Sequence, residues 1–134
     1  MYNVNKFKGF TLVELLITVA ILGILASIAY PSYTSFVMRS DRAEPQRELL
    51  RLANLQEQLY SDSRAYTEDM KELGLSQDPY ITESGNYSID ATVNGATFIL
   101  TATAKASQTG DTGCTTLTIN ETGLKTPAGS CWEQ

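Results

Sequence analysis

The sequence predicts an α+β protein in which a long N-terminal helix packs against a small antiparallel sheet of about three to four strands. Two observations carry this prediction: a long apolar segment leads into a stripe of leucines, and the second half of the chain alternates apolar and polar residues. Apolar residues at three- and four-residue spacing indicate one face of a helix, whereas strict alternation indicates half-buried strands. A chain of 134 residues has room for one hydrophobic core.

The apolar segment covers residues 10–37, and Glu14 is its single charged side chain. A helix of this length at ~1.5 Å per residue reaches ~42 Å, more than the ~30 Å hydrocarbon core of a bilayer requires. We therefore expect residues 10–37 to span a membrane in the first half of the long helix. Residues 38–134 are expected to form a globular domain outside the membrane.

Two simpler interpretations of the apolar segment stay open at this point. It is compatible with a signal peptide that is cleaved after Ala29, or with a plain anchor whose Lys6 and Lys8 remain in the cytoplasm. Glu14 counts against both, because a carboxylate inside an apolar membrane segment costs roughly 2.5–3.5 kcal/mol and marks a functional residue.

Residues 6–15 read Lys-Phe-Lys-Gly-Phe-Thr-Leu-Val-Glu-Leu and resemble the processing motif of type IV pilins and pseudopilins. The resemblance implies the pilin fold and a leader peptide of residues 1–9. Prepilin peptidase would cut between Gly9 and Phe10 and methylate the new amino group of Phe10. Glu14 would pair with that amine during filament assembly, and Gly23 and Pro31 lie where the family's helix loosens in assembled pili.

The leucine stripe predicts that the helix runs from about Phe10 to about Ser61, with Pro31 and Pro45 as interruptions. A loop with one short helical turn at 68–73 is expected to follow. The stripe consists of Leu49, Leu52, Ala53, Leu55, Gln56 and Leu59. Arg39, Arg42, Arg47 and Arg51 interleave with acidic residues, which favours a salt-bridged helix surface over a lipid or subunit contact.

Period-two alternation predicts strands at 87–93, 98–104 and 115–120, with Asn94-Gly95 as a two-residue hairpin turn. Cys114 and Cys131 are expected to form one disulfide, because a chain with an even, low cysteine count that is exported meets oxidising conditions. The alternative is a pair of buried free thiols. The pair also resembles the disulfide-bounded C-terminal region of small minor pilins, where Lys125 and Trp132 would form a contact site or simply pack.

Composition argues against most other functions. The chain has 10 Lys and Arg, 15 Asp and Glu, no histidine and a net charge of −5. We expect no catalytic residues, metal or cofactor, since histidine-based catalysis and most zinc sites are excluded. The acidic balance makes nucleic acid an unlikely partner.

The expected function is that of a structural or assembly subunit, most simply a minor pilin of a type IV pilus. The alternatives are a pseudopilin of a type II secretion system and a pilin-like receptor for DNA or surfaces. Expected partners are prepilin peptidase, other pilins in a homo- or hetero-oligomeric filament, and the pilus assembly platform. The chain would wait in the bacterial inner membrane with its head in the periplasm and become extracellular on assembly.

Overall fold

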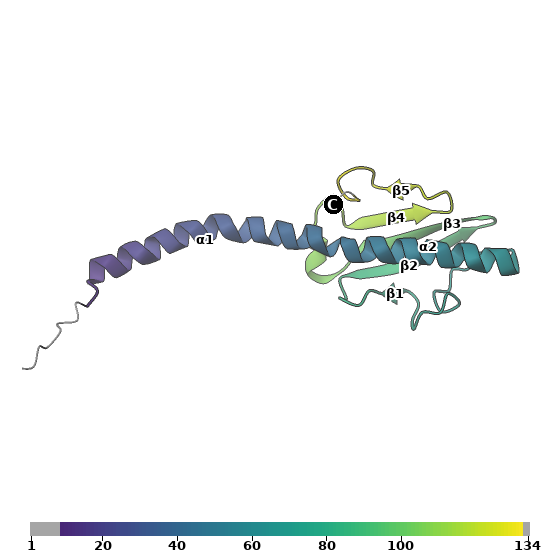
Figure 1. Cartoon of the computed structure of the whole chain (residues 1–134), viewed down its shortest axis with the longest axis horizontal. Helices are drawn as coiled ribbons and strands as arrows, with labels where there is room; N and C mark the ends of the chain where they lie inside the picture. Colours follow the sequence, from purple (N-terminus) through teal and green to yellow (C-terminus); the bar gives the residue numbers. More distant parts are fainter. Residues whose placement is uncertain (1–8, 133–134) are drawn as a thin grey trace, which may run out of the picture. The chain divides into compact units, whose positions relative to one another are not determined.

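The computed structural model describes residues 9–132, and the predicted leader lysines Lys6 and Lys8 lie outside this range. The chain divides into two compact units, Met1–Thr34 and Ser35–Gln134. The first unit contains most of helix α1 (Leu12–Asp41), and the second contains helix α2 (Ala43–Ser63) and a five-stranded sheet. In this second unit α2 lies across one face of the sheet (Figure 1).

The helices depart from the expected single helix of residues 10–61 in three ways. The first helix begins at Leu12, the second ends at Ser63, and Arg42 separates them. Arg42 keeps helical angles (φ −63°, ψ −23°). The separation arises because Pro45 has no N–H to donate to the Asp41 carbonyl, as the sequence suggested. By contrast, α1 continues through Gly23 and Pro31 without a break.

The leucine stripe packs on the sheet as predicted. Leu49, Leu52 and Gln56 are completely buried, and Ala53, Leu55 and Leu59 pack partly buried beside them. The helix ends where Arg64 adopts a left-handed conformation (φ +60°) and donates its N–H to the carbonyl of Tyr60 at 2.9 Å.

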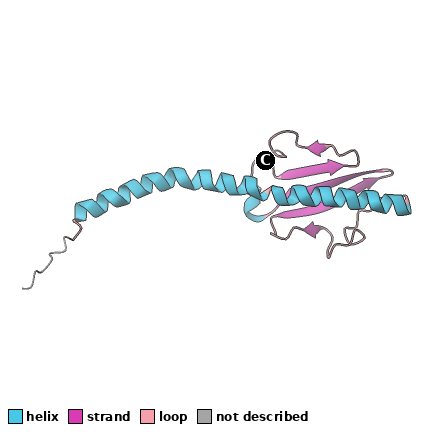
Figure 2. Cartoon of the chain, in the orientation of Figure 1, coloured by secondary structure: helices cyan, strands magenta, loops and turns pink. Residues whose placement is uncertain are grey.

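Three long strands form the centre of the antiparallel sheet (Figure 2): β2 (Tyr87–Asn94), β3 (Thr97–Ala104) and β4 (Thr116–Asn120). Their alternate residues turn toward α2, which confirms the predicted period of two. The buried members of this face are Tyr87, Ile89, Ala91, Phe98, Leu100, Ala102, Ala104, Leu117 and Ile119.

Two further strands of two residues each, β1 (Tyr80–Ile81) and β5 (Lys125–Thr126), extend the sheet to five strands. The expected number of three to four was therefore too low, because two residues carry no detectable periodicity. The hairpin also differs by one residue: Asn94 pairs with Thr97, so the turn is Gly95-Ala96. Gly95 has φ +61°, the conformation for which a hairpin turn favours glycine.

The loop between α2 and the sheet contains consecutive turns at 69–74 and no helix, contrary to the expected helical turn. Met70 and Leu73 of this loop are buried in the core. The amide of Gln56 fixes the start of the loop, because it donates to the Thr67 carbonyl at 2.6 Å and accepts the Thr67 N–H at 3.0 Å. The α2 stripe is thus completed by a loop whose burial the sequence did not reveal.

Candidate functional site

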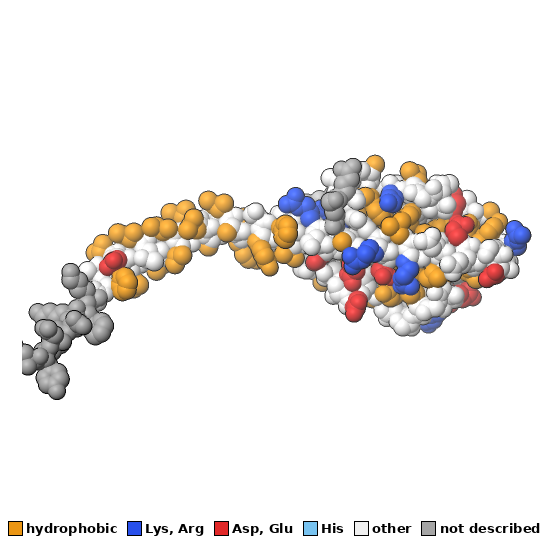
Figure 3. All heavy atoms as spheres, in the orientation of Figure 1, with side chains coloured by type: hydrophobic (Ala, Val, Ile, Leu, Met, Phe, Trp, Pro, Cys, Tyr) orange, Lys and Arg blue, Asp and Glu red, His pale blue; other side chains and the backbone are white. Residues whose placement is uncertain are grey.

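The apolar surface of the first unit is the first candidate for function. No residue of α1 is buried, and its large apolar side chains are exposed except for the half-buried Val37 and Met38 near its end. The helical stretch Leu12–Ser63, which includes α1, Arg42 and α2, contains an 18-residue window of mean hydropathy 2.5, so it is long and apolar enough to cross a membrane. Hydrophobic side chains dominate the visible surface of α1 in Figure 3. Such a surface needs lipid or other helices to cover it.

Glu14 lies in the first turn of this apolar helix. Thr11 caps the helix: its Oγ1 accepts the N–H of Glu14 at 3.2 Å, and its carbonyl accepts the N–H of Leu15 at 3.1 Å. A negative charge here interacts favourably with the helix dipole. The capping role of Thr11 was not predicted, although Thr-x-x-Glu is a recognised helix-start signature.

The predicted processing residues and the other predicted assembly residues also lie in the first unit. Gly9 and Phe10 precede the helix, and the Phe10 side chain is exposed. A methyl group built on Gly23 meets nothing within 4 Å, so no contact in the described chain requires glycine there. Pro31 lies within the helix. The expected loosening near Pro31 therefore stays a prediction for the assembled filament.

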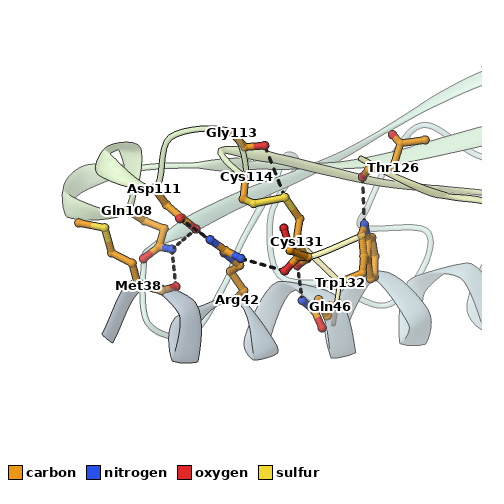
Figure 4. The surroundings of a disulfide bond; sticks show 11 residues. Met38, Arg42, Gln46, Gln108, Asp111, Gly113, Cys114, Thr126, Cys131 and Trp132 are labelled. Atoms are coloured by element: carbon orange, nitrogen blue, oxygen red, sulfur yellow. Dashed lines mark hydrogen bonds and ion pairs between the residues drawn. A yellow bond between two sulfur atoms is a disulfide. The ribbon is translucent and has the colours of Figure 1, made fainter. Parts of the chain in front are cut away.

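The predicted disulfide between Cys114 and Cys131 is present, with a Cα–Cα distance of 5.5 Å. Both cysteines are buried, and they join the start of β4 to the end of the described chain. The bond lies beside the first turns of α2 (Figure 4). It holds the carbonyl groups of Ser130 and Cys131 within reach of helix side chains.

Arg42 makes the central contact beside the disulfide. Its Nε and Nη2 each donate to a different carboxylate oxygen of Asp111 at 2.5 Å, and its Nη1 donates to the Ser130 carbonyl at 3.2 Å (Figure 4). Both charged side chains are buried. The hydrogen bond to Asp111 raises the pKa of Arg42, so the guanidinium stays charged.

Two glutamines extend this contact on either side. Gln46 donates to the Cys131 carbonyl at 2.8 Å, and Gln108 donates to the Met38 carbonyl at 2.9 Å and to Asp111 at 3.3 Å. We call the set of Arg42, Gln46, Gln108, Asp111 and the disulfide the clasp. It fastens the end of α1 and the start of α2 to the short 3-10 helix η1 (Ala106–Gly110) with the adjoining Asp111, and to the C-terminal residues Ser130 and Cys131.

The clasp corrects the expectation that the arginine run is only a salt-bridged helix surface. Arg51 does pair locally with Glu48, at 2.6 Å. Arg42, however, pairs with a residue 69 positions away, and no local spacing could indicate that partner.

Comparison with known proteins bears on both units. A family model described as "Type IV minor pilin ComP, DNA uptake sequence receptor" matches residues 31–118. A second model, for the prokaryotic N-terminal methylation motif, matches residues 4–30. The chain belongs to the type IV minor pilin family. Prepilin peptidase processing and filament assembly are what the methylation motif implies.

Relatives and a solved structure agree with this assignment. The pilin is 37% identical over 106 residues to the fimbrial protein EcpC of Eikenella corrodens, covering 75% of this chain and 64% of that protein. It is 41% identical over 69 residues to the major pilin PilA of Myxococcus xanthus, covering 52% of this chain and 31% of that protein. These matches span less than two thirds of either relative's length.

The fold resembles a type IV pilin from Shewanella oneidensis, with a TM-score of 0.55 and 26% identity. The similarity covers 72% of this chain and 99% of that one. The predicted pilin fold is therefore confirmed, and the family is one of structural filament subunits.

Lys125 and Trp132, the predicted contact site of this pilin, contact each other. The Lys125 ammonium lies 5.1 Å from the centre of the indole ring, and the Trp132 Nε1–H donates to the Thr126 carbonyl at 3.0 Å. Trp132 therefore packs over the edge strand β5 and occupies one of its backbone acceptors. This protects the edge of the sheet from pairing with another chain.

Replacing Asp111 with alanine should destabilise the pilin head by about 3–5 kcal/mol, because it leaves the buried Arg42 charge without a partner. The effect is measured by urea unfolding of the full chain in detergent micelles, with circular dichroism as the signal. The matched control is Arg51→Ala, which breaks an exposed pair and should cost under about 1 kcal/mol. An equal decrease in the free energy of unfolding in the two variants would contradict a structural role for the clasp.

Tyr87 leads to a prediction about alkaline pH. Its hydroxyl is completely buried without a hydrogen bond in the described residues 9–132, and burial, partly offset by the nearby Gln108 amide, raises its pKa to about 12. The raised pKa stabilises the fold below pH ~10, and this stability is lost as the pH rises toward 12.

Tyr87→Phe should therefore unfold at higher pH than the wild-type protein and lose little stability at pH 7, since it removes an unsatisfied group. Alkaline titration monitored by circular dichroism tests this. Tyr80→Phe is the control at a half-buried position. A large loss of stability of the Tyr87→Phe variant at pH 7 would show that the Tyr87 hydroxyl has a hydrogen-bond partner.

Proposed function

We propose that this chain is made as a prepilin and becomes a minor subunit of a type IV pilus. Residues 1–9 are the leader, prepilin peptidase cuts between Gly9 and Phe10, and Phe10 becomes the methylated N-terminus. The observation that carries the proposal is the methylation motif at residues 4–30, which leads directly into an apolar helix without a buried residue.

In this proposal residues 10–37 first hold the subunit in the inner membrane, with residues 38–134 in the periplasm. The same segment then packs against other pilins when the assembly platform draws the subunit into the filament. Gly23 and Pro31 allow the helix to loosen during this transfer, since Pro31 already lacks one helical hydrogen bond. A pseudopilus subunit would share this N-terminus, but the relatives described above are pilins and fimbrial proteins.

DNA binding is a second candidate, favoured by the family model's description as a DNA uptake sequence receptor. It competes with the expectation, drawn from the acidic composition, that nucleic acid is an unlikely partner. Several cations of the head are already engaged: Arg42 with Asp111, Arg51 with Glu48, and Lys125 over Trp132. A gel-shift titration with duplex DNA at increasing salt decides, because phosphate contacts make affinity fall steeply with salt.

The mature chain should begin at N-methylated Phe10. Intact mass spectrometry of the membrane-extracted protein checks this prediction. Gly9→Leu should leave full-length precursor, because the peptidase motif requires an extended backbone without a side chain at that position. A chain that begins at Tyr30 would indicate signal peptidase and would overturn the processing step.

Glu14→Ala should leave cleavage intact but strongly reduce incorporation into pili. The carboxylate is then missing as a partner for the Phe10 amine, while the monomer becomes easier to insert in the bilayer. The measurement is the amount of this chain in sheared pili at equal membrane levels. Thr18→Ala is the control, since it changes the same region of the helix without removing charge. Normal incorporation of the Glu14 variant would exclude its assembly role.

A further inference from the structure

A groove of about 310 Å³ opens in the head between α2 and the end of β4. Phe98 and Ile119, both almost completely buried, form its floor, and Leu50 forms a wall with 41% of its surface exposed. This volume lies at the lower end of the range for ligand pockets and suits a single long side chain. Neither the disulfide clasp nor the apolar helix of the first unit contributes to it.

Two carboxylates lie on the rim of this groove, Glu57 from α2 and Glu121 from the turn after β4. Glu57 Oε1 accepts the hydroxyl of Tyr66 at 2.9 Å, and Glu121 Oε2 accepts the N–H of Phe98 at 3.4 Å. Within residues 9–132, the second oxygen of each carboxylate has no hydrogen bond from the protein, and no lysine or arginine lines the groove. The groove thus presents negative charge above an apolar floor.

The rim carboxylate on α2 is held by an aromatic cluster. Tyr66 stacks on Tyr60 with ring centres 4.6 Å apart and meets Phe98 edge-on at 4.8 Å. Burial, together with the hydrogen bond to Glu57, raises the pKa of Tyr66 to about 12, so its hydroxyl remains a donor at neutral pH. The hydrogen bond from Tyr66 therefore restrains the Glu57 carboxylate beside the groove, which lowers the entropic cost of binding.

We propose that this groove receives an arginine or lysine side chain from a neighbouring pilin subunit. Such a side chain fits both parts of the groove, because its methylene stem covers apolar surface while its charged end reaches carboxylates. The choice of a pilin as the neighbour rests on the proposed function, since a filament places subunits side by side. The chemistry of the groove itself does not depend on it.

The first experiment tests the chemistry of the groove alone. Full-length protein in detergent micelles is titrated with N-acetyl-arginine methylamide, and amide NMR signals of Phe98 and residues 120–123 are followed. The neutral isostere N-acetyl-citrulline methylamide is the matched probe. We expect saturable shifts with the arginine probe and at least about tenfold weaker binding with citrulline, a difference of about 1.4 kcal/mol.

The double variant Glu57→Gln and Glu121→Gln should weaken arginine binding to the level of citrulline. The control Glu72→Gln removes an exposed carboxylate outside the groove and should leave binding unchanged. Equal binding of both probes, or full arginine binding by the double variant, overturns the proposal.

The second experiment tests the neighbour. A photo-crosslinking amino acid replaces Asn54, an exposed residue on the groove, and pili are sheared after irradiation. We expect a crosslink to a pilin peptide that contains arginine or lysine. If the chain enters pili without such a crosslink, the neighbour is wrong and the proposed function stands. If it never enters pili while the arginine titration succeeds, the proposed function and the pilin neighbour both fail.

Discussion

The position of α2 on the sheet is the constraint on which the head depends, because this helix, together with the buried loop residues Met70 and Leu73, covers the buried face of the three long strands. Several polar contacts fix it, and two of them bracket the buried leucines of α2. Arg42, just before α2, binds Asp111, and Gln56 binds Thr67. Gln56 lies fourteen residues after Arg42, which is about 21 Å along a helix. Between these points Glu44 accepts the N–H of Ser84 at 3.0 Å, Gln46 donates to the Cys131 carbonyl at 2.8 Å, and the leucines pack on the strands. Apolar packing alone specifies burial, whereas the polar contacts specify how the helix is placed along the sheet.

The sequence predicted the parts of the fold that depend on periodicity. The stripe around Leu49 and Leu52, the three long strands and the cysteine pair follow from local spacing or from composition. It did not reveal β1, β5 or the buried loop residue Met70, because these short segments obtain their structure from neighbours rather than from their own pattern. Of the clasp, only the disulfide was predicted. The partner of Arg42 depends on a contact across 69 residues, and single-sequence patterns carry no information about such pairs.

The chain uses its acidic groups in two contrasting ways. Asp111 is buried and fully matched by Arg42, so this charge is satisfied within the head. Glu14 lies on an exposed apolar helix, and Thr11 binds its backbone N–H rather than its carboxylate. Within residues 9–132 the Glu14 carboxylate has no ion pair, and a carboxylate in an apolar setting favours any state that brings it a cation. Cleavage before Phe10 would create such a cation four residues away, which is why processing and assembly are naturally coupled in the proposed function.

Charge also bears on what the head contacts in a filament. Residues 38–134 carry a net negative charge, so the surface of the head disfavours the DNA backbone unless its cations are concentrated in one place. The same surface attracts basic side chains of proteins, and the groove beside Glu57 and Glu121 adds an apolar floor that a hydrated ion or a phosphate would not use. Because the floor and the carboxylates occur together, the groove favours a basic protein side chain over nucleic acid, even within a family whose description names a DNA receptor. DNA binding by this pilin would therefore require a surface separate from the groove.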